Sequence, residues 1–453
     1  MPKSDHRSTP RRDFLKGTAR LAAASALAAV TIPHVHAGED NTIRLAIVGS
    51  GSRGSGAVAD ALSATDGPVK LVAMADLLPE RLASSHQALS KEFGEKIDVP
   101  KERQFLGFDG YRKAIDCLRP GDVALLTTHA GFRATHLEYA VQKGVHAFME
   151  KNFAPDPGGI QRILRAAEAA EKKNLKIAAG LMCRHSAARQ AMIQKIRDGA
   201  LGQVQLIRAY RMDSGYRMAP MPRGENELLW QLRPGHPYQF LWSSGGILIE
   251  LMIHQIDECC WIKDGWPVSA HGVGGRRAGS TDCSQNLDSY SIEYTFADGT
   301  KALVTGRYIP NCVNDFITYV HGTKCAGQFS GNIHAPTSRI YKDQHTSDNN
   351  VAWKAERERS SPYHAEWKVL LEAIRNDRPH NEARRAAFSN LTAMMGRAAV
   401  HSGKIITWDE AMASKFRFFA GDVADLTADS PAPVHADAEG RYPAPVPGAW
   451  SEI

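Results

Sequence analysis

Residues 43–54 read IRLAIVGSGSRG, a short apolar run followed at once by a glycine-rich turn. The apolar run is typical of a strand that is buried on both faces of a parallel sheet. In the pattern Gly-x-Gly-x-x-Gly, the first glycine permits a tight turn, the second lets the backbone approach a pyrophosphate, and the third allows a helix to pack closely on the strand. The phosphates then lie at the N-terminus of that helix. The turn therefore predicts a dinucleotide site that includes Gly49, Ser50, Gly51, Arg53 and Gly54.

A second predicted strand, residues 70–76, ends in an acidic side chain. Asp76 follows Gly54 by 22 residues, the spacing at which a carboxylate accepts hydrogen bonds from the ribose hydroxyls of the adenosine. The alternative interpretation is that Asp76 is the N-cap of the helix that begins near Pro79. A carboxylate at the ribose repels a 2'-phosphate, so NAD is predicted over NADP, and Arg53 and Arg81 weaken this preference.

Strands and helices alternate from residue 41 to about residue 155, which predicts a right-handed parallel sheet. Residues 122–128 and 145–150 form two more predicted strands, with a helix at 136–143 between them. Ligands of such sheets bind beyond the carboxyl ends of the strands. The remaining predicted cofactor-binding residues are Thr127, Thr128, His136, Glu150 and Lys151.

With these motifs, the chain resembles the Gfo/Idh/MocA family, which comprises enzymes similar to glucose-fructose oxidoreductase and inositol dehydrogenase. The resemblance rests on the glycine turn, residues 131–133, His136 and residues 144–151, and it covers about residues 41–415. It implies a Rossmann domain followed by a domain whose open sheet covers the nicotinamide and receives a sugar, cyclitol or similar polyol. The family's strand-end Glu-Lys-Pro stands here as residues 150–152, Glu-Lys-Asn, and His129 occupies a position that is usually proline.

The second domain is predicted to be α+β, with an open and largely antiparallel sheet. Residues 176–180 and 203–210 are predicted strands, residues 289–296 and 300–307 a hairpin, and residues 316–320 a further strand. Helices are predicted at residues 365–374 and 386–400, and Thr407 is the predicted start of a capped helix.

Residues 245–257 form a predicted helix on which Glu250 and His254 share one face. This segment resembles the family's Asp-x-x-x-His, with glutamate in place of aspartate. The resemblance implies that His254 and Lys151 surround the carbon that gives up hydride, with His254 as the base and Lys151 as the group that orients and polarises the oxygen. A hydrogen-bonded core histidine is the alternative for His254. A metal site with Asp257 is not predicted, because no third ligand is marked by spacing.

Several side chains of the second domain are candidates for contact with the substrate. Arg184 and His185 follow the strand at 176–180, and the alternative interpretation places both on a loop surface. The aromatic segment at residues 234–242 could stack on a sugar ring or pack in the core. The predicted substrate-binding residues are Arg184, His185, Tyr210, Glu250 and His254.

The N-terminus resembles a twin-arginine export signal. Arg11 and Arg12 precede an alanine-rich apolar stretch, residues 21–30, and a small-residue cleavage site ends at Ala37. The alternatives are a cytosolic helix and a membrane anchor, although so short an apolar stretch cannot span about 30 Å of hydrocarbon. The prediction is a periplasmic protein that is exported by the twin-arginine translocase.

Composition limits the other classes of protein. The 453 residues are 43% hydrophobic and 23% charged, which excludes a disordered chain. Residues 1–37 hold six Lys or Arg and two Asp, so +4 of the net charge of +6 lies there. Because the rest of the chain has little excess positive charge, nucleic acid is not expected as a partner. The seven cysteines form no CxxC, which excludes a zinc knuckle. The predicted boundaries are 1–37 (signal), 41–155 (Rossmann), 156–415 (substrate and oligomerisation) and 416–453 (an extended arm suited to wrapping a neighbouring subunit of a homo-oligomer).

The predicted function is an NAD-dependent oxidoreductase that acts on a sugar, polyol or sugar derivative. Because a periplasm offers no sizeable soluble NAD pool, the cofactor should be loaded before export and held tightly, and the net chemistry should be redox-neutral. One alternative is a glycosidase that uses transient oxidation and elimination, with Lys151, His254 or Tyr210 as proton carriers. A non-catalytic sugar-binding protein on the same scaffold is the alternative from another class.

Overall fold

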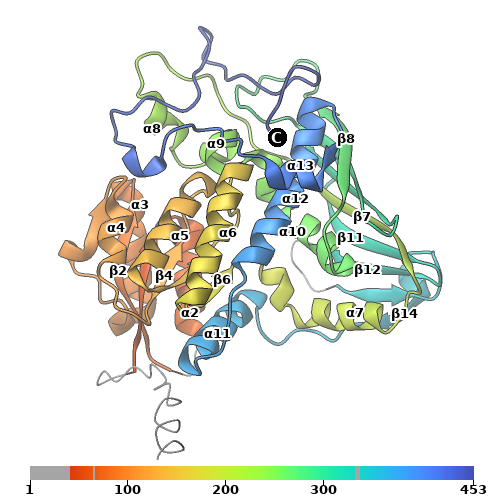
Figure 1. The fold of residues 1–453 in the computed structure, drawn as a ribbon, viewed down its shortest axis with the longest axis horizontal. Coiled ribbons are helices and arrows are strands. Elements are labelled where there is room, and N and C mark those ends of the chain that lie inside the picture. Colours follow the sequence, from red (N-terminus) through yellow and green to blue (C-terminus); the bar gives the residue numbers. More distant parts are fainter. Residues whose placement is uncertain (1–40, 65–66, 332–336) are drawn as a thin grey trace, which may run out of the picture. The chain divides into compact units, whose positions relative to one another are not determined.

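In the part of the chain that the structure describes, six parallel strands form the first sheet, in the order β3-β2-β1-β4-β5-β6 (Figure 1). Its strands are β1 (Ile43–Val48), β2 (Val69–Asp76), β3 (Gln104–Leu106), β4 (Val123–Leu126), β5 (His146–Met149) and β6 (Ile177–Ala179). The helices between them are α2 (Ser52–Ser63), α3 (Pro79–Phe93), α4 (Gly110–Ile115), α5 (Ala130–Lys143) and α6 (Pro157–Lys172). Every residue of β4 and β5 is buried, as expected of strands covered on both faces. The predicted Rossmann fold is confirmed.

The computed structural model describes residues 41–64, 67–331 and 337–453, and residues 42–453 form one compact unit. The predicted signal at residues 1–37 lies outside the described residues. Within those described ranges, no helix has both the length and the apolar character that crossing a membrane requires.

Among the described residues, nine strands form the second sheet, in the order β14-β13-β12-β11-β7-β10-β9-β8-β15. Only the pair β10–β7 is parallel among the described strands of this sheet, so the predicted open, largely antiparallel sheet is confirmed. The strands are β7 (Val204–Asp213), β8 (Ser269–Gly275), β9 (Ser289–Thr295), β10 (Lys301–Tyr308), β11 (Asp315–Gly322), β12 (Ala326–Gly331), β13 (Arg339–Tyr341), β14 (Val351–Lys354) and β15 (Ile406–Thr407).

Two long, mostly buried helices, α10 and α12, pack against this sheet and against each other (Figure 1). The helices of this part are α7 (Ala187–Arg197), α8 (Glu227–Gln231), α9 (Leu241–Ser244), α10 (Gly246–Lys263), α11 (Pro362–Arg375), α12 (Ala383–Ser402) and α13 (Trp408–Ala413). Thr407 and Glu410 form a capping box at the start of α13, which confirms the predicted capped start.

Helix α12 also joins the two sheets, because it packs on α6. The Asn390 side chain accepts a hydrogen bond from the Phe153 N–H (2.9 Å) and donates one to the Ala154 carbonyl (3.0 Å). Arg397, fully buried, donates to the Pro155 and Gly245 carbonyls and pairs with Glu452. These contacts hold the segment that follows β5 against the N-terminal end of α10.

The strand at residues 176–180 was predicted within the second domain, and this prediction is wrong. In the structure β6 pairs in parallel with β5 and is the sixth strand of the first sheet. The reason is the crossover through α6, which returns the chain to the edge of the sheet that β5 leaves open. Residues that follow β6 therefore start at the ligand-binding edge of the first sheet.

The segment 416–453 is extended, as predicted, with only one short 3-10 turn, but the expectation that it has little core is wrong. Its apolar side chains join a third hydrophobic cluster with residues of the segment 218–242. Figure 1 shows this C-terminal segment, in dark blue, running past α8 and α9. Hydrogen bonds support the packing: Gln231 donates to the Val434 carbonyl (2.7 Å), and the Met221 N–H to the Gly440 carbonyl (2.9 Å). The segment 416–453 finds its partners within its own chain.

Candidate functional site

The glycine-rich turn between β1 and α2 has no room for side chains at two of its positions. Gly49 has a φ of +100°, and a Cβ there would lie 2.7 Å from the Thr128 nitrogen. A Cβ at Gly54 would lie 2.1 Å from the Gly49 carbonyl oxygen. Helix α2 follows with glycine as its N-cap, so no side chain covers its first N–H groups. These groups can therefore receive an anion.

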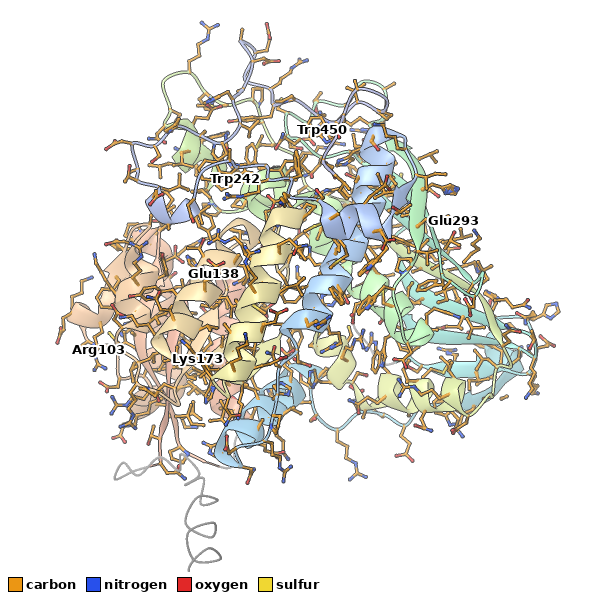
Figure 2. The ribbon with its side chains drawn as sticks, in the orientation of Figure 1. Arg103, Glu138, Lys173, Trp242, Glu293 and Trp450 are labelled. Carbon is orange, nitrogen blue, oxygen red and sulfur yellow. The ribbon has the colours of Figure 1, made fainter. Side chains whose placement is uncertain are left out.

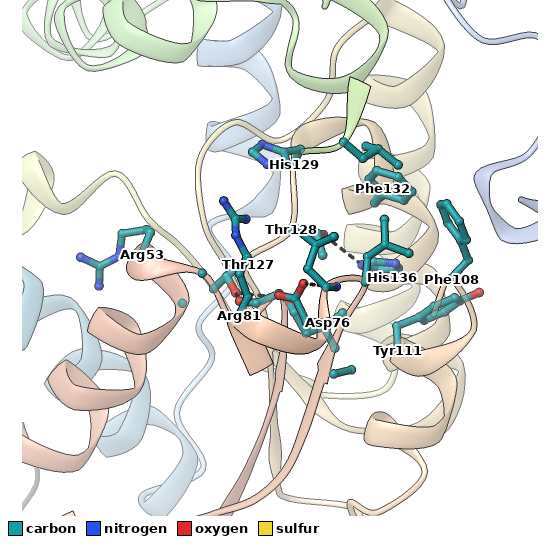
Figure 3. Close-up of a pocket in the computed structure, with 18 of the residues that line it drawn as sticks. Arg53, Asp76, Arg81, Phe108, Tyr111, Thr127, Thr128, His129, Phe132 and His136 are labelled. Carbon is teal, nitrogen blue, oxygen red and sulfur yellow. Dashed lines mark hydrogen bonds between the residues drawn. The ribbon is translucent and has the colours of Figure 1, made fainter. Parts of the chain in front are cut away.

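A cavity opens above this turn, at the carboxyl ends of β1, β2 and β4 (Figure 3). The cavity thus lies at the edge of the sheet where doubly wound folds bind their ligands. The predicted cofactor residues that line it are Gly49, Gly51, Arg53, Gly54, Asp76, Thr127, Thr128 and His136. Of the other predicted residues, Ser50 donates its N–H to Asp76 (2.6 Å), and Glu150 and Lys151 follow the end of the neighbouring strand β5.

The Asp76 carboxylate, at the end of β2, can still accept hydrogen bonds from a ligand. It accepts hydrogen bonds from the N–H groups of Ser50 (2.6 Å) and Leu78 (2.9 Å). A carboxylate has about four acceptor sites, so two remain for ribose hydroxyls. Burial raises the pKa of Asp76, and the two N–H groups oppose this change. The N-cap of α3 is Leu78, so the alternative interpretation of Asp76 as the N-cap is wrong.

Aromatic and basic side chains that the motifs did not mark complete the cavity. Arg81 belongs to the first turn of helix α3. Its Nη1 lies over the glycine-rich turn, 3.4 Å from the position that a Cβ on Gly51 would take. Tyr111 stacks on His136 at 4.3 Å between ring centroids, and His136 Nδ1 lies 3.1 Å from the Thr128 hydroxyl. Burial lowers the pKa of His136 to about 3. Further lining residues that were not predicted as cofactor contacts include His129, Phe108, Phe132, Leu232, Gly235 and Tyr238.

Some of these residues carried a signal in the sequence and others did not. Tyr238 lies in the aromatic segment 234–242, and its ring faces His129 edge-on at 5.3 Å, so this part of the segment belongs to the cavity. Trp242, labelled in Figure 2, instead packs between Phe132 and Phe419 in the third cluster. Phe108 follows no motif, and only tertiary packing brings it here.

Arg53 and Glu150 connect the glycine turn to the end of β5. Arg53 Nε lies 3.0 Å from Glu150 Oε1, and its guanidinium also pairs with Asp60 at 2.6 Å. The Tyr363 ring lies under the same guanidinium at 4.8 Å. Burial raises the pKa of Glu150, and the charge of Arg53 opposes this change. This ion pair connects helix α2 to Glu150 and Lys151, the residues that follow β5.

Lys151 and Glu250 form an ion pair between the end of β5 and α10. Lys151 Nζ also donates to the Glu250 carbonyl (2.9 Å), and the Asn152 amide donates to Glu250 Oε2 (2.9 Å). The Lys151–Asn152 peptide bond is cis. His254 lies one helical turn after Glu250, is 7% exposed, and has Cys183 Sγ at 3.9 Å from its Nδ1. The structure thus brings Lys151, Glu250 and His254 to one region of α10.

Arg184 and His185 engage acidic partners of their own chain. Arg184 binds Asp257 through two hydrogen bonds of 2.8 Å and lies over the Trp261 ring. Although burial alone would raise it, the Arg184 guanidinium lowers the pKa of Asp257. His185 Nε2 lies 3.5 Å from Glu382 Oε1. Arg184 therefore has a buried partner within the protein, and the contact of Arg184 and His185 with substrate stays a prediction.

Tyr210, a predicted substrate-binding residue, lies on the face of the sheet that points away from α10 and therefore away from the group around Lys151. Arg211 pairs with Gly306, where an added Cβ would lie 2.7 Å from Met252 Sδ on α10. Because successive side chains of a strand alternate between faces, Arg211 is on the α10 face and Tyr210 is on the open face of the sheet. There its hydroxyl accepts a hydrogen bond from Arg208 (3.3 Å).

Asp257, considered above as a metal ligand, binds Arg184 and Ser389 instead. In residues 41–64, 67–331 and 337–453, no three His, Cys, Asp or Glu side chains are grouped so that they could hold a metal ion.

Comparisons with known proteins agree with this architecture. Residues 189–326 match the model of the GFO/IDH/MocA C-terminal domain. A search of the curated proteins finds no match.

Solved structures share the fold at low sequence identity. Aldose-aldose oxidoreductase from Caulobacter crescentus, complexed with glycerol, is 17% identical, with a TM-score of 0.62 over 81% of this chain and 99% of its own. Scyllo-inositol dehydrogenase from Lactobacillus casei, with bound NAD(H) and scyllo-inositol, is 20% identical, with a TM-score of 0.59 over 81% and 99%. A putative NADPH-dependent oxidoreductase from Desulfitobacterium hafniense is 18% identical, with a TM-score of 0.63 over 83% and 100%.

Proposed function

We propose that this protein is a nicotinamide-dependent oxidoreductase of the Gfo/Idh/MocA type that acts on a sugar, a polyol or a sugar derivative. The observation that carries the proposal is the continuity of the site: one sheet edge bears the glycine turn, Asp76 and, at the neighbouring strand end, the Lys151–Glu250 pair. The matched C-terminal domain and the sugar and polyol oxidoreductases of the same fold support it.

The residues present fit a dinucleotide. The first N–H groups of α2 would hold the diphosphate, Arg81 would offset its charge, and Asp76 would bind the adenosine ribose, which favours NAD. When bound, the nicotinamide accepts a hydride from a carbon that carries a hydroxyl. A lysine ammonium has three N–H donors, and two of those of Lys151 are directed to Glu250, so one remains to orient and polarise the substrate oxygen. Sequence reasoning assigns the proton acceptor to His254.

Replacing Asp76 by alanine tests the cofactor assignment. Loss of charge-assisted hydrogen bonds of about 1.5–3 kcal/mol should weaken NAD affinity about 10- to 100-fold, with a smaller effect on NADP. Calorimetric titration of the nucleotide-free protein with each nucleotide gives both constants. Asp98→Ala, which removes an exposed carboxylate paired with Arg103, should leave both unchanged. NADP as the dominant nucleotide released on denaturation of the wild type would contradict the assignment.

The cavity is covered from one side by residues of the segment 218–242, which favours a retained cofactor. Leu232, Gly235 and Tyr238 line the cavity, and the C-terminal segment holds this cover in place. Glu227 carries two of the connecting hydrogen bonds, from His435 Nδ1 and from the Ala436 N–H, both at 2.7 Å. We therefore expect movement of this cover to influence the rate of nucleotide release.

Glu227→Ala should therefore speed nucleotide release about tenfold, because the loss of about 1.4 kcal/mol changes an equilibrium tenfold. The rate is measured as loss of nicotinamide fluorescence from the reduced complex after dilution into excess NAD. Glu225→Ala is the matched control, since Glu225 pairs with Arg233 inside the cover and not with the C-terminal segment. Equal release rates in the wild type and both variants would mean that the cover does not limit exchange.

A retained cofactor must return to its starting redox state in each cycle, and we extend the proposal to redox-neutral chemistry in the periplasm. The net reaction is either hydride passed from one sugar to a second, or cleavage of a glycoside by transient oxidation, elimination and hydride return. The purified protein is incubated with candidate sugars and glycosides without added nucleotide. Multiple turnovers support the closed cycle, and strict dependence on added NAD contradicts it. Sugar binding without any change in nicotinamide absorbance would instead indicate a non-catalytic binding protein.

A further inference from the structure

A fully buried ion pair joins α12 to the segment 416–453. Arg397 Nε lies 2.6 Å from Glu452 Oε1, and neither side chain is exposed to solvent. The other carboxylate oxygen of Glu452 accepts a hydrogen bond from Trp450 Nε1 (2.8 Å; Figure 2) and lies 3.1 Å from His401 Nδ1. Because buried ion pairs often stabilise a fold no more than apolar pairs of similar volume do, stability alone does not explain these charges.

The charges of this pair persist at neutral pH. Burial alone would raise the pKa of Glu452, but the charge of Arg397, with His401 beside it, lowers this pKa to about 2. The guanidinium of an arginine stays protonated in proteins. The Glu452 carboxylate therefore holds the Arg397 guanidinium in place throughout the neutral range.

The same guanidinium reaches the two segments that carry the Lys151–Glu250 pair. Its Nη1 donates to the Pro155 carbonyl (3.0 Å) and to the Gly245 carbonyl (2.8 Å). Pro155 lies four residues after Lys151, and Gly245 lies five residues before Glu250, directly before α10. One nitrogen of Arg397 thus bridges the chain that follows β5 and the start of α10.

The chain that follows Lys151 is bound along its length. The Asn152 amide donates to the Ser244 carbonyl (2.9 Å). Asn390, which lies two turns before the arginine on α12, binds the backbone of residues 153–154 at 2.9 and 3.0 Å. A displacement at the far end of this short stretch is therefore passed on to Lys151 and is not absorbed within the stretch.

We propose that Arg397, held by Glu452, is a positioning residue that sets the place of Lys151 relative to Glu250. The proposal rests on the proposed function, in which Lys151 orients and polarises the substrate oxygen. Arg397 acts through the two carbonyls that it bridges. Misplacing a catalytic group by about 1 Å can slow a reaction about 10²-fold. Loss of the bridge should therefore slow hydride transfer and leave nucleotide affinity unchanged, because the glycine turn packs on residues 127–128.

The test removes both charges together in the full chain. Arg397→Met with Glu452→Gln leaves neither charge of the pair alone in the interior, so the free energy of unfolding should stay near that of the wild type. Hydride transfer is followed in a single turnover by nicotinamide fluorescence with the most reactive sugar or polyol, and it should be about 10²-fold slower with nucleotide bound. Calorimetric titration should give an unchanged nucleotide affinity. A wild-type rate, or a loss of affinity that matches the loss of rate, would overturn the inference.

The matched control is the double variant Arg162→Met with Glu138→Gln. Arg162 Nε on α6 lies 2.9 Å from Glu138 Oε1 on α5, so this pair joins two helices that flank the first sheet. The rate of hydride transfer should not change in the control. An equal slowing in both double variants would show that the loss of any such ion pair has this effect, and it would overturn the inference.

A further measurement does not depend on turnover. The nitrogen resonance of the Lys151 ammonium is followed by NMR and is assigned by its loss in Lys151→Met. It should shift in the variant that lacks the Arg397–Glu452 pair and stay in place in the control. An unshifted resonance would contradict the positioning role.

If that double variant fails to fold, Arg397→Lys is measured in the same way. Lysine keeps the charge opposite Glu452 but has one nitrogen in place of the two that make these contacts, so hydride transfer should be about tenfold slower. A wild-type rate in Arg397→Lys would then overturn the inference and leave the proposed function standing. No hydride transfer in the wild type with any sugar or polyol would contradict the proposed function itself.

Discussion

Replacing Lys151 by methionine is expected to lower the turnover number about 10³-fold while the nucleotide stays bound. Methionine keeps the stem of the side chain but removes the charge that orients and polarises the substrate oxygen. It also leaves Glu250 with Asn152 as its one remaining side-chain partner among the described residues, which should cost about 1–3 kcal/mol of stability. Turnover is measured on the sugar that gives the fastest hydride transfer, and stability by denaturant unfolding.

A double variant separates the catalytic effect from the structural one. Glu250→Gln removes the carboxylate that Lys151→Met leaves unpaired, so the double variant should recover stability without recovering turnover. Lys143→Ala is the control, because Lys143 pairs with Asp116 at the exposed end of α5. If turnover recovered together with stability, Lys151 would be a structural residue and not a catalytic one.

Replacing Gly54 by alanine is expected to reduce bound nucleotide from about one per chain to an undetectable amount. The new Cβ would meet the Gly49 carbonyl oxygen at 2.1 Å and Thr127 Oγ1 at 2.8 Å. Because backbone at such a distance must shift, α2 would move away from β1 and the turn would lose the shape that receives a diphosphate. Nucleotide content is measured by mass spectrometry of the native protein.

Gly265→Ala is the matched control for this variant. An added Cβ there would have one neighbour, the Lys263 carbonyl oxygen at 3.9 Å, so nucleotide content should not change. Near-stoichiometric nucleotide in Gly54→Ala would contradict the assignment of the turn to the cofactor.

The parts of the fold that sequence reasoning predicted correctly depend on local patterns. The apolar run at 43–48, the glycines at 49–54 and the position of Asp76 are set by spacing along the chain, and β1, the turn and β2 lie where these patterns indicate. The hairpin of β9 and β10 was predicted from two alternating runs that flank a short turn. Such patterns predict local structure because residues that are close in the sequence contact each other in almost any packing.

Contacts between distant segments were not predictable in the same way. β6 was assigned to the wrong sheet because a short apolar strand carries no mark of its neighbour. The face on which Tyr210 lies depends on where α10 packs, some 40 residues later. The cover of the cavity, formed by residues of the segment 218–242, is held by residues 416–453, which lie far away in the sequence.

The sequence by itself determined the positions of the glycine turn, Asp76 and Lys151, because each lies at the end of a strand that neighbouring residues define. Only the tertiary structure decided what those groups face. Glu250 contacts Lys151 and Asn152, Arg184 pairs with Asp257, and the His129 ring packs edge-on against Tyr238. The physical reason is that strand periodicity places a side chain at an edge, whereas its partners come from long-range packing, which burial of apolar surface drives without regard to position in the sequence.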